Sequence, residues 1–226
     1  MTKVFIATPA YSGTVHVPYA ISLAETQTYL ALQGIQCQFQ LNCSGSLLVA
    51  ERNRLIYSFL QSDCTHMLCI DGDLGWPCQS VKGLLDHDVD FVAGVYPTRK
   101  DNLFLFRPVF NDDKSIVKHP IRPLLKMNYI PAGFMLLKRE AVQKMIDSHQ
   151  DTFFESKDPV SPIPNGYALF NTEVVGKEFW GEDYVFCRRA REAGIDIWVD
   201  PMIEFDHAGV RGMLAFVLTD KKELSA

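Results

Sequence analysis

The sequence contains no run approaching about 18 consecutive apolar residues, the length of a helix that crosses a bilayer. It also opens without the apolar stretch of a signal peptide, because the short run Val4–Ala7 reaches Pro9 almost at once. These two absences predict a chain with no transmembrane segment and a cytoplasmic location.

Paired cysteines of the kind that hold zinc are also missing, because none of them stands in a Cys-x-x-Cys pair. The six cysteines are scattered at positions 37, 43, 64, 69, 78 and 187. Cys69, for example, lies in the apolar segment Met67–Ile70. We therefore expect free thiols in a reducing compartment and no zinc site.

An excess of basic residues is the third absence, since 22 Lys and Arg stand against 27 Asp and Glu, a formal charge of -5. A surface that binds nucleic acid or an anionic membrane normally shows the opposite balance, so neither is expected as the main partner. A negatively charged nucleotide remains compatible with it, because one bound cation and a few basic side chains outweigh a mild net charge.

What is present is the composition of an ordinary globular protein, with 47% apolar and 22% charged residues. Two full domains would be cramped in 226 residues. We expect a single domain that spans residues 1–226.

Apolar runs that favour strands alternate with segments of helical periodicity along most of the chain. The expected strands are residues 3–8, 35–41, 66–70, 91–96, 132–137 and 195–199, and the expected helices are residues 17–33, 46–60, 79–85, 139–148 and 182–193. This alternation predicts an α/β fold with a mostly parallel central sheet flanked by helices. The proline-rich segments 97–123 and 151–177 are expected to be long connections that border a binding site.

Two carboxylates, Asp71 and Asp73, follow the apolar run 66–70 directly, with the small Gly72 between them. Ligands of such sheets bind at the carboxyl ends of the strands, where these residues should lie. Oxygen ligands at this spacing suit a hard cation such as Mn²⁺ or Mg²⁺. An isolated pair of this kind more often caps a turn, so its meaning depends on the rest of the sequence.

A second acidic pair, Glu182 and Asp183, follows Trp180 and opens an expected helix. Acidic residues in a first helical turn commonly serve the helix dipole. After a loop with glycine and an aromatic residue, such a pair is also placed to deprotonate a hydroxyl group. His207, shortly after a late strand, could complete the shell of a metal ion.

The order of these segments resembles that of GT-A glycosyltransferases, especially the family 2-like and Anp1-like branches of bacteria, phages and large viruses. The segments that carry the resemblance are residues 46–54, 65–74, 90–97, 131–136 and 181–186, and the likeness covers roughly residues 3–210. It implies a Rossmann-like GT-A domain with a nucleotide-binding part at about 1–100 and an acceptor and catalytic part at about 101–215.

The resemblance also implies roles for individual residues on the donor side. Pro9, Ala10 and Tyr11 would line the nucleotide pocket and Arg54 would lie close to the donor. Asp71, with the neighbouring Gly72, would meet the ribose or the metal, and Asp73 the metal itself.

On the acceptor side, the resemblance implies that Gly133 and Phe134 border the acceptor, and Trp180 is a candidate to stack on it. Asp183, or else Glu182, would be the catalytic base, and His207 a possible third metal ligand. The basic pairs at 99–100 and 188–189 could contact phosphates, although such pairs usually lie in solvent.

The implied reaction is metal-dependent transfer of a sugar from a nucleotide-diphosphate sugar to the hydroxyl of a glycan or another acceptor, with inversion if Asp183 acts as base. A non-catalytic nucleotide-sugar binding module is an open alternative. A phosphatase with an Asp-x-Asp motif fits less well, because its motif belongs on the first strand and here it follows the third. A nucleotidyltransferase fits less well too, because no glycine-rich loop with Arg and Lys stands near the beginning.

Overall fold

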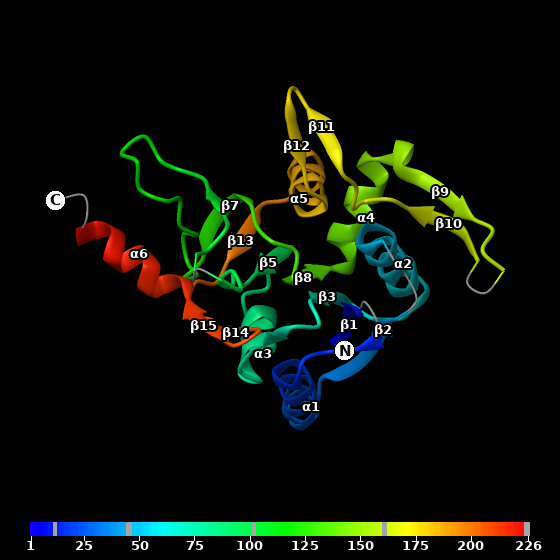
Figure 1. Cartoon of the computed structure of the whole chain (residues 1–226), viewed down its shortest axis with the longest axis horizontal. Helices are drawn as coiled ribbons and strands as arrows, with labels where there is room; N and C mark the ends of the chain where they lie inside the picture. The colour runs from blue at the N-terminus through cyan, green and yellow to red at the C-terminus, as the bar shows by residue number, and fades with distance from the viewer. Residues whose placement is uncertain (11–12, 44–46, 101–102, 160–161, 224–226) are drawn as a thin grey trace.

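An eight-stranded mixed sheet forms the centre of the computed structural model, which describes residues 1–10, 13–43, 47–100, 103–159 and 162–223 (Figure 1). From one edge to the other its strands are β2 (Gln36–Asn42), β1 (Lys3–Pro9), β3 (His66–Ile70), β8 (Phe134–Lys138), β5 (Phe91–Ala93), β13 (Ile197–Val199), β7 (Leu125–Tyr129) and β6 (Arg107–Pro108).

Six of these strands run in one direction, and β8 and β7 run against them. Parallel pairing joins β2, β1 and β3, and also β5 with β13. Antiparallel pairing places β8 between β3 and β5, and β7 between β13 and β6. The predicted fold class, an α/β domain with a mostly parallel central sheet flanked by helices, is confirmed.

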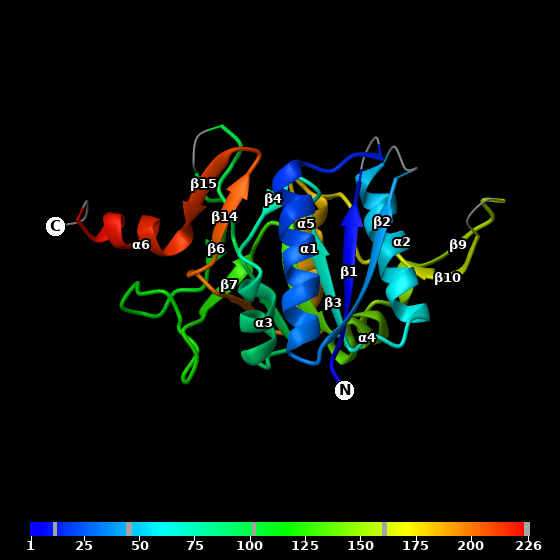
Figure 2. The same ribbon diagram turned by 90° about the horizontal axis from the view of Figure 1, so that it is seen from below.

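Helices cover both faces of this sheet because its buried strands are apolar on both sides (Figures 1 and 2). One face packs against α2 (Leu48–Gln61), α4 (Arg139–Ser148) and α5 (Glu182–Glu192), and the other against α1 (Val17–Leu32) and α3 (Gln79–Asp86). Strand β1 shows the alternation: Phe5 and Ala7 belong to the first core, and Val4 and Ile6 to the second.

Smaller sheets are attached to this frame. The strands β4 (Leu74–Gly75), β14 (Glu204–His207) and β15 (Val210–Met213) form a three-stranded sheet, and two hairpins pair β9 (Phe153–Ser156) with β10 (Ile163–Tyr167) and β11 (Glu173–Val175) with β12 (Glu178–Trp180). The expectation of one long connection at 151–177 is therefore wrong, because paired strands with exposed faces occupy much of it.

The helix α6 (Leu214–Glu223) follows β15 and extends away from the central sheet in both views (Figures 1 and 2). Within the described part of the chain, none of the helices combines the length and the apolar character needed to traverse a bilayer.

Candidate active site

The candidate site lies where β3 ends and β8 begins. Because β8 runs against β3, with Ile70 opposite Phe134, the residues after β3 face those before β8. The backbone N–H of Asp71 donates a hydrogen bond to the carbonyl of Gly133 at 3.0 Å. This contact fixes the acidic motif against the beginning of β8.

Both carboxylate oxygens of Asp71 have partners within the protein. Oδ1 accepts a hydrogen bond from Arg52 Nη2 at 2.7 Å, and Oδ2 accepts one from the hydroxyl of Tyr96 at 3.3 Å. The side chain of Arg52 is 4% exposed, so its pairing with the Asp71 carboxylate offsets the cost of burying its charge. Asp71 is therefore held in one orientation at the end of β3.

Tyr96 connects the acidic motif to the rest of the site. Its hydroxyl accepts a hydrogen bond from the backbone N–H of Gly133 at 3.1 Å, and its ring meets that of His207 edge to face at 5.0 Å between centroids. Burial, followed by the nearby charge of Asp71, raises the pKa of Tyr96 well above its usual range. The hydroxyl therefore stays protonated and can keep donating to Asp71.

Gly133 is the residue that allows these groups to meet. A Cβ atom at this position would lie 2.5 Å from Asp71 Oδ2 and closer still to the hydroxyl of Tyr96. No side chain fits there without displacing one of the two.

Asp73 is brought to His207 by strand pairing. The two residues after Asp73 form β4, which pairs with β14 so that Leu74 lies opposite His207. The backbone N–H of Ala208 donates to the carbonyl of Asp73 at 3.2 Å. As a result, Asp73 Oδ2 and His207 Nε2 lie 3.2 Å apart, although 134 positions separate the two residues.

The orientation of the His207 ring is set by its other nitrogen. Nδ1 lies 2.6 Å from the carbonyl oxygen of Pro97, which can only accept, so Nδ1 carries a proton and donates it. This leaves the Nε2 atom directed at Asp73 and at the side chain of Arg99, whose Nε–H donates to Nε2 at 3.2 Å. Arg99 Nη2 also pairs with Asp73 Oδ2.

Interactions within this cluster shift the pKa values of Asp73 and His207. Burial raises the pKa of Asp73, but His207 and Arg99 outweigh it and hold the pKa below its ordinary value. Burial lowers the pKa of His207, whereas the nearby Asp73 carboxylate and the Pro97 carbonyl raise it, and the net shift is upward. Asp73 is therefore an anion across the neutral range.

The donor atoms of this pair fit a divalent cation. A carboxylate oxygen and an imidazole nitrogen about 3 Å apart can occupy adjacent corners of an octahedron with ligand distances of about 2.1 Å. Among the described residues, however, no group of three or more His, Cys, Asp and Glu side chains could hold a metal ion. A cation at Asp73 and His207 would need its other ligands from water or from a bound diphosphate.

The two residues of the second acidic pair, Glu182 and Asp183, have different partners. Glu182 Oε1 lies 3.6 Å from Arg52 Nε, so Glu182 shares the buried cation that also pairs with Asp71. Asp183 Oδ1 accepts the backbone N–H of Tyr184 at 2.8 Å. Burial first, and the neighbouring charge of Glu182 second, raise the pKa of Asp183 above its ordinary value. The raised pKa makes Asp183 a candidate proton acceptor.

Several other predicted residues lie at the same edge of the sheet. Pro9 ends β1, which is parallel to β3, and the half-buried Pro9 is followed by Ala10 at 3% exposure. The carbonyl of Gly72 accepts the N–H of His16 at 2.8 Å, so the loop after β1 packs against the acidic motif. Tyr11 falls outside the described residues.

Two predicted residues, Arg54 and Phe134, have contacts other than the expected ones. Arg54, expected close to the donor, instead pairs with Asp158 at 3.2 Å and with Glu51 at 3.7 Å, and Arg52 takes the place beside Asp71. Phe134, expected to border the acceptor, has a side chain that is 0% exposed, because on β8 it faces the core and packs against Phe205 at 4.9 Å between ring centroids.

Trp180 is half-buried and belongs to an aromatic cluster beside the first turn of α5. Its ring meets that of Tyr129 edge to face at 5.3 Å, and the ring of Tyr129 stacks on Tyr184 at 4.9 Å. Arg107 and Arg191 lie over the ring of Tyr129, at 5.9 and 4.7 Å from its centroid. Trp180 remains an acceptor-side prediction.

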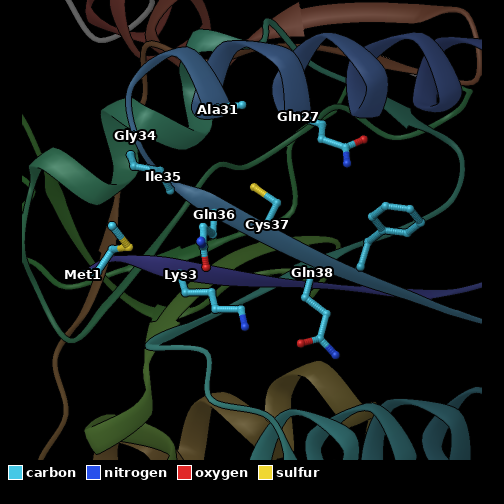
Figure 3. A pocket seen from close by; sticks show the side chains of 10 residues that line it. Met1, Lys3, Gln27, Ala31, Gly34, Ile35, Gln36, Cys37 and Gln38 are labelled. Carbon is cyan, nitrogen blue, oxygen red and sulfur yellow. The ribbon is translucent and has the colours of Figure 1, made fainter.

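Two pockets help to locate the site. One of about 410 Å³ lies beside Asp73 and is lined by Tyr96, Pro97, Thr98, Arg99, Lys100, Leu105, Pro131 and His207. A larger one of about 830 Å³, shown in Figure 3, is lined by residues from the beginning of β1, the end of α1 and the edge strand β2. The latter therefore opens near the amino ends of these strands, opposite the acidic motif.

Comparisons with known proteins bear on the fold alone. No protein-family profile and no curated protein matches the sequence. Among solved structures, the chain is similar to A197 from STIV, with a TM-score of 0.51 and 16% identity over 92% of this chain and 85% of that one.

Two further likenesses are looser and carry no argument. They are the catalytic domain of Drosophila beta1,4galactosyltransferase 7 in complex with xylobiose (TM-score 0.46, 16% identity, 88% of this chain and 65% of that one) and S. aureus TarS 1-349 in complex with UDP-GlcNAc (TM-score 0.48, 12% identity, 88% and 56%). The expectation of a GT-A-like fold from the sequence is confirmed.

Proposed function

We propose that this protein is a glycosyltransferase that moves a sugar from a nucleotide-diphosphate sugar to the hydroxyl of a glycan or another acceptor, with Mn²⁺ or Mg²⁺ as cofactor. The observation that carries this proposal is the carboxyl end of β3, where Asp71 is held by Arg52 and Tyr96 while Asp73 meets His207 at 3.2 Å. Asp71 would recognise the nucleotide, and Asp73 would bind the cation together with a second metal ligand, His207.

Each residue has a role in this reaction. Asp73 and His207 would hold the cation, which neutralises negative charge on a departing diphosphate when it is bound. Asp71, whose orientation is fixed, would accept hydrogen bonds from the ribose. Pro9, Ala10, Tyr11 and Gly72 would border the nucleotide.

Asp183 would take the proton from the acceptor hydroxyl as that oxygen attacks the sugar, because it is the acidic residue with a raised pKa and without the cation that Glu182 shares. Direct attack inverts the anomeric carbon. Gly133 and Trp180 would lie on the acceptor side, so residues of about 1–100 serve the donor and residues of about 101–215 the acceptor.

The test is a thermal-shift screen of UDP-, GDP-, dTDP- and CDP-sugars with and without Mn²⁺, since a ligand of the folded state raises the melting temperature. We expect one nucleotide to stabilise the wild type only with Mn²⁺, and Asp73→Asn to abolish that response. Asp86→Asn, a change at an exposed residue of α3, is the matched control and should respond as wild type. A screen in which no nucleotide shifts the melting temperature would contradict the proposal.

Turnover separates the enzyme from the alternatives. Metal-dependent release of free sugar from the stabilising donor, followed by mass spectrometry, should occur in the wild type and be lost in Asp183→Asn while donor binding persists. Donor binding without turnover under any condition would favour a non-catalytic binding module. Hydrolysis of p-nitrophenyl phosphate that depends on Asp71 would favour a phosphatase.

A further inference from the structure

The side chain of Arg99 occupies the same two atoms that suit a cation. Its Nη2 pairs with Asp73 Oδ2 and its Nε–H donates to His207 Nε2 at 3.2 Å. A divalent cation needs the lone pairs of both atoms, and its charge repels a guanidinium at contact distance. Arg99 and a metal ion at this pair therefore exclude each other.

The contact is of a kind that can be released. The side chain of Arg99 is 62% exposed, so its guanidinium can be solvated by water when it leaves the Asp73 carboxylate, which is 10% exposed. The buried Arg52, at 4%, is by contrast locked to Asp71. Of the two arginines beside the acidic motif, Arg99 is the one that can change partners at low cost.

A place for the released side chain lies beside it. Arg99 and Lys100 both line the pocket of about 410 Å³ that also includes Tyr96 and His207. Among the described residues, Lys100 has no carboxylate partner. Arg99 pairs with the carboxylate of Asp73. An anion with several oxygens, such as a diphosphate, would satisfy both basic groups there.

We propose that Arg99 exchanges partners: it spans Asp73 and His207 in the free protein, and it pairs with the diphosphate of the donor once a divalent cation takes those two atoms. The inference rests on the proposed function, which supplies the cation and the diphosphate. It makes Arg99 a positioning residue that opposes the binding of metal alone and favours the binding of metal and diphosphate together.

The first test measures Mn²⁺ binding without nucleotide, by electron paramagnetic resonance of free Mn²⁺ during titration. Arg99→Met keeps an unbranched apolar stem and removes the guanidinium, and Lys100→Met removes a charge from the neighbouring position. We expect Arg99→Met to bind Mn²⁺ about fivefold more tightly than wild type, the release of a partly exposed ion pair. Lys100→Met should stay within about twofold, since it only weakens the general field.

The second test measures inorganic pyrophosphate binding by calorimetry at saturating Mn²⁺. Here the order reverses, and Arg99→Met should bind pyrophosphate about tenfold more weakly than wild type, the loss of a charge-assisted contact. Melting temperatures without ligands should agree within about two degrees, because the side chain is exposed.

The outcomes separate this inference from the proposed function. If wild type and Arg99→Met bind Mn²⁺ equally, and Asp73→Asn binds none, the metal site stands and the partner exchange is wrong. If Mn²⁺ binding tightens but pyrophosphate binding is unchanged, the second half of the exchange is wrong. If neither wild type nor Arg99→Met binds Mn²⁺, the metal site of the proposed function fails as well.

Discussion

Arg52 Nη2 lies 2.7 Å from Asp71 Oδ1, and Nε of the same guanidinium lies 3.6 Å from Glu182 Oε1. One buried cation thus joins the end of β3 to the first turn of α5. Asp183 lies beside this pairing, and burial first, with the neighbouring charge of Glu182 second, raises its pKa. The neighbouring carboxylates therefore differ in their surroundings: Asp71 and Glu182 share the guanidinium, and Asp183 is half-buried next to them.

Replacing Arg52 by Met should destabilise the fold, because two carboxylates would face each other without their cation. Asp71 and Glu182 keep 26% and 20% of their side-chain exposure, so we expect a loss of about 1–3 kcal/mol rather than the larger cost of a fully buried charge. Urea denaturation measures it. Lys82→Met in α3, whose ion pair with Asp86 is largely exposed to solvent, should cost less than about 1 kcal/mol. Equal losses in the two variants would contradict this assignment.

Asp183→Asn should lower kcat by about 100-fold or more, since general base catalysis commonly contributes that much, while donor affinity stays near wild type. In the wild type, kcat/KM should fall as the pH drops through the pKa of Asp183. The midpoint should lie above that of an ordinary aspartate, because burial raises this pKa. A pH profile of donor turnover gives the midpoint. A variant with full activity would assign the base elsewhere.

The raised pKa of Asp183 also predicts that the Asp183→Asn variant is more stable than wild type. Since the pKa of Asp183 is higher in the folded than in the unfolded chain, the folded state favours the protonated form. Stability is thus largest below both pKa values and decreases as the pH rises through them. Asp183→Asn removes this loss, so its melting temperature should exceed that of wild type at pH 7, and the difference should disappear in acid. A lower melting temperature at pH 7 would contradict the sign.

Gly133→Ala should damage both fold and site, because the added Cβ lies 2.5 Å from Asp71 Oδ2. Displacing backbone or Asp71 should cost about 1–3 kcal/mol and reduce donor binding. The control is Gly83→Ala in α3, where nothing lies within 4 Å of the new atom and helix propensity favours alanine by about 0.5–1 kcal/mol. Denaturation curves and thermal shift with donor measure the pair. A Gly133→Ala variant as stable as wild type would show that there is room for a Cβ atom at position 133.

Tyr96→Phe should cost about 1–2 kcal/mol, since the N–H of Gly133 loses its acceptor and Asp71 loses a donor. Donor affinity should fall as well, because Asp71 is then held by Arg52 alone. Tyr29→Phe on α1 is the control, as no hydrogen bond of its hydroxyl is found among the described residues. Equal stability of both variants, measured in urea, would remove Tyr96 from the support of Asp71.

Most of the regular elements were predictable from periodicity. The expected helix at 139–148 and strand at 66–70 match the structure to the residue, and most others of the first half differ by one or two positions, although the strand expected at 91–96 already ends at Ala93. The strand β7 and the hairpins were missed, because their exposed or short segments carry little apolar pattern. The antiparallel direction of β8 was also not predicted, since a strand pattern has no direction.

The acidic motif and His207 were among the predicted site residues, whereas Arg52 and Tyr96 were not. Arg52 and Arg54 are two residues apart on one helix, so only one of them can face the core. The apolar positions Val49, Ile56 and Phe59 repeat at helical spacing and place Arg52 on the buried side, a signal that was available. Arg99, by contrast, depends on where a loop returns across 26 residues to Asp73, and local sequence does not encode that distance.

The register between β3 and β8 has one more consequence. Asp71 meets Gly133 because Ile70 lies opposite Phe134, and the same pairing buries the side chain of Phe134. A slip by one residue would turn Phe134 outward and push a side chain into the space that only glycine leaves free. The packing of Phe134 in the core and the position of Asp71 at the candidate site therefore depend on the same register. A chain with this core correctly packed also has its acidic motif at the right distance from Gly133.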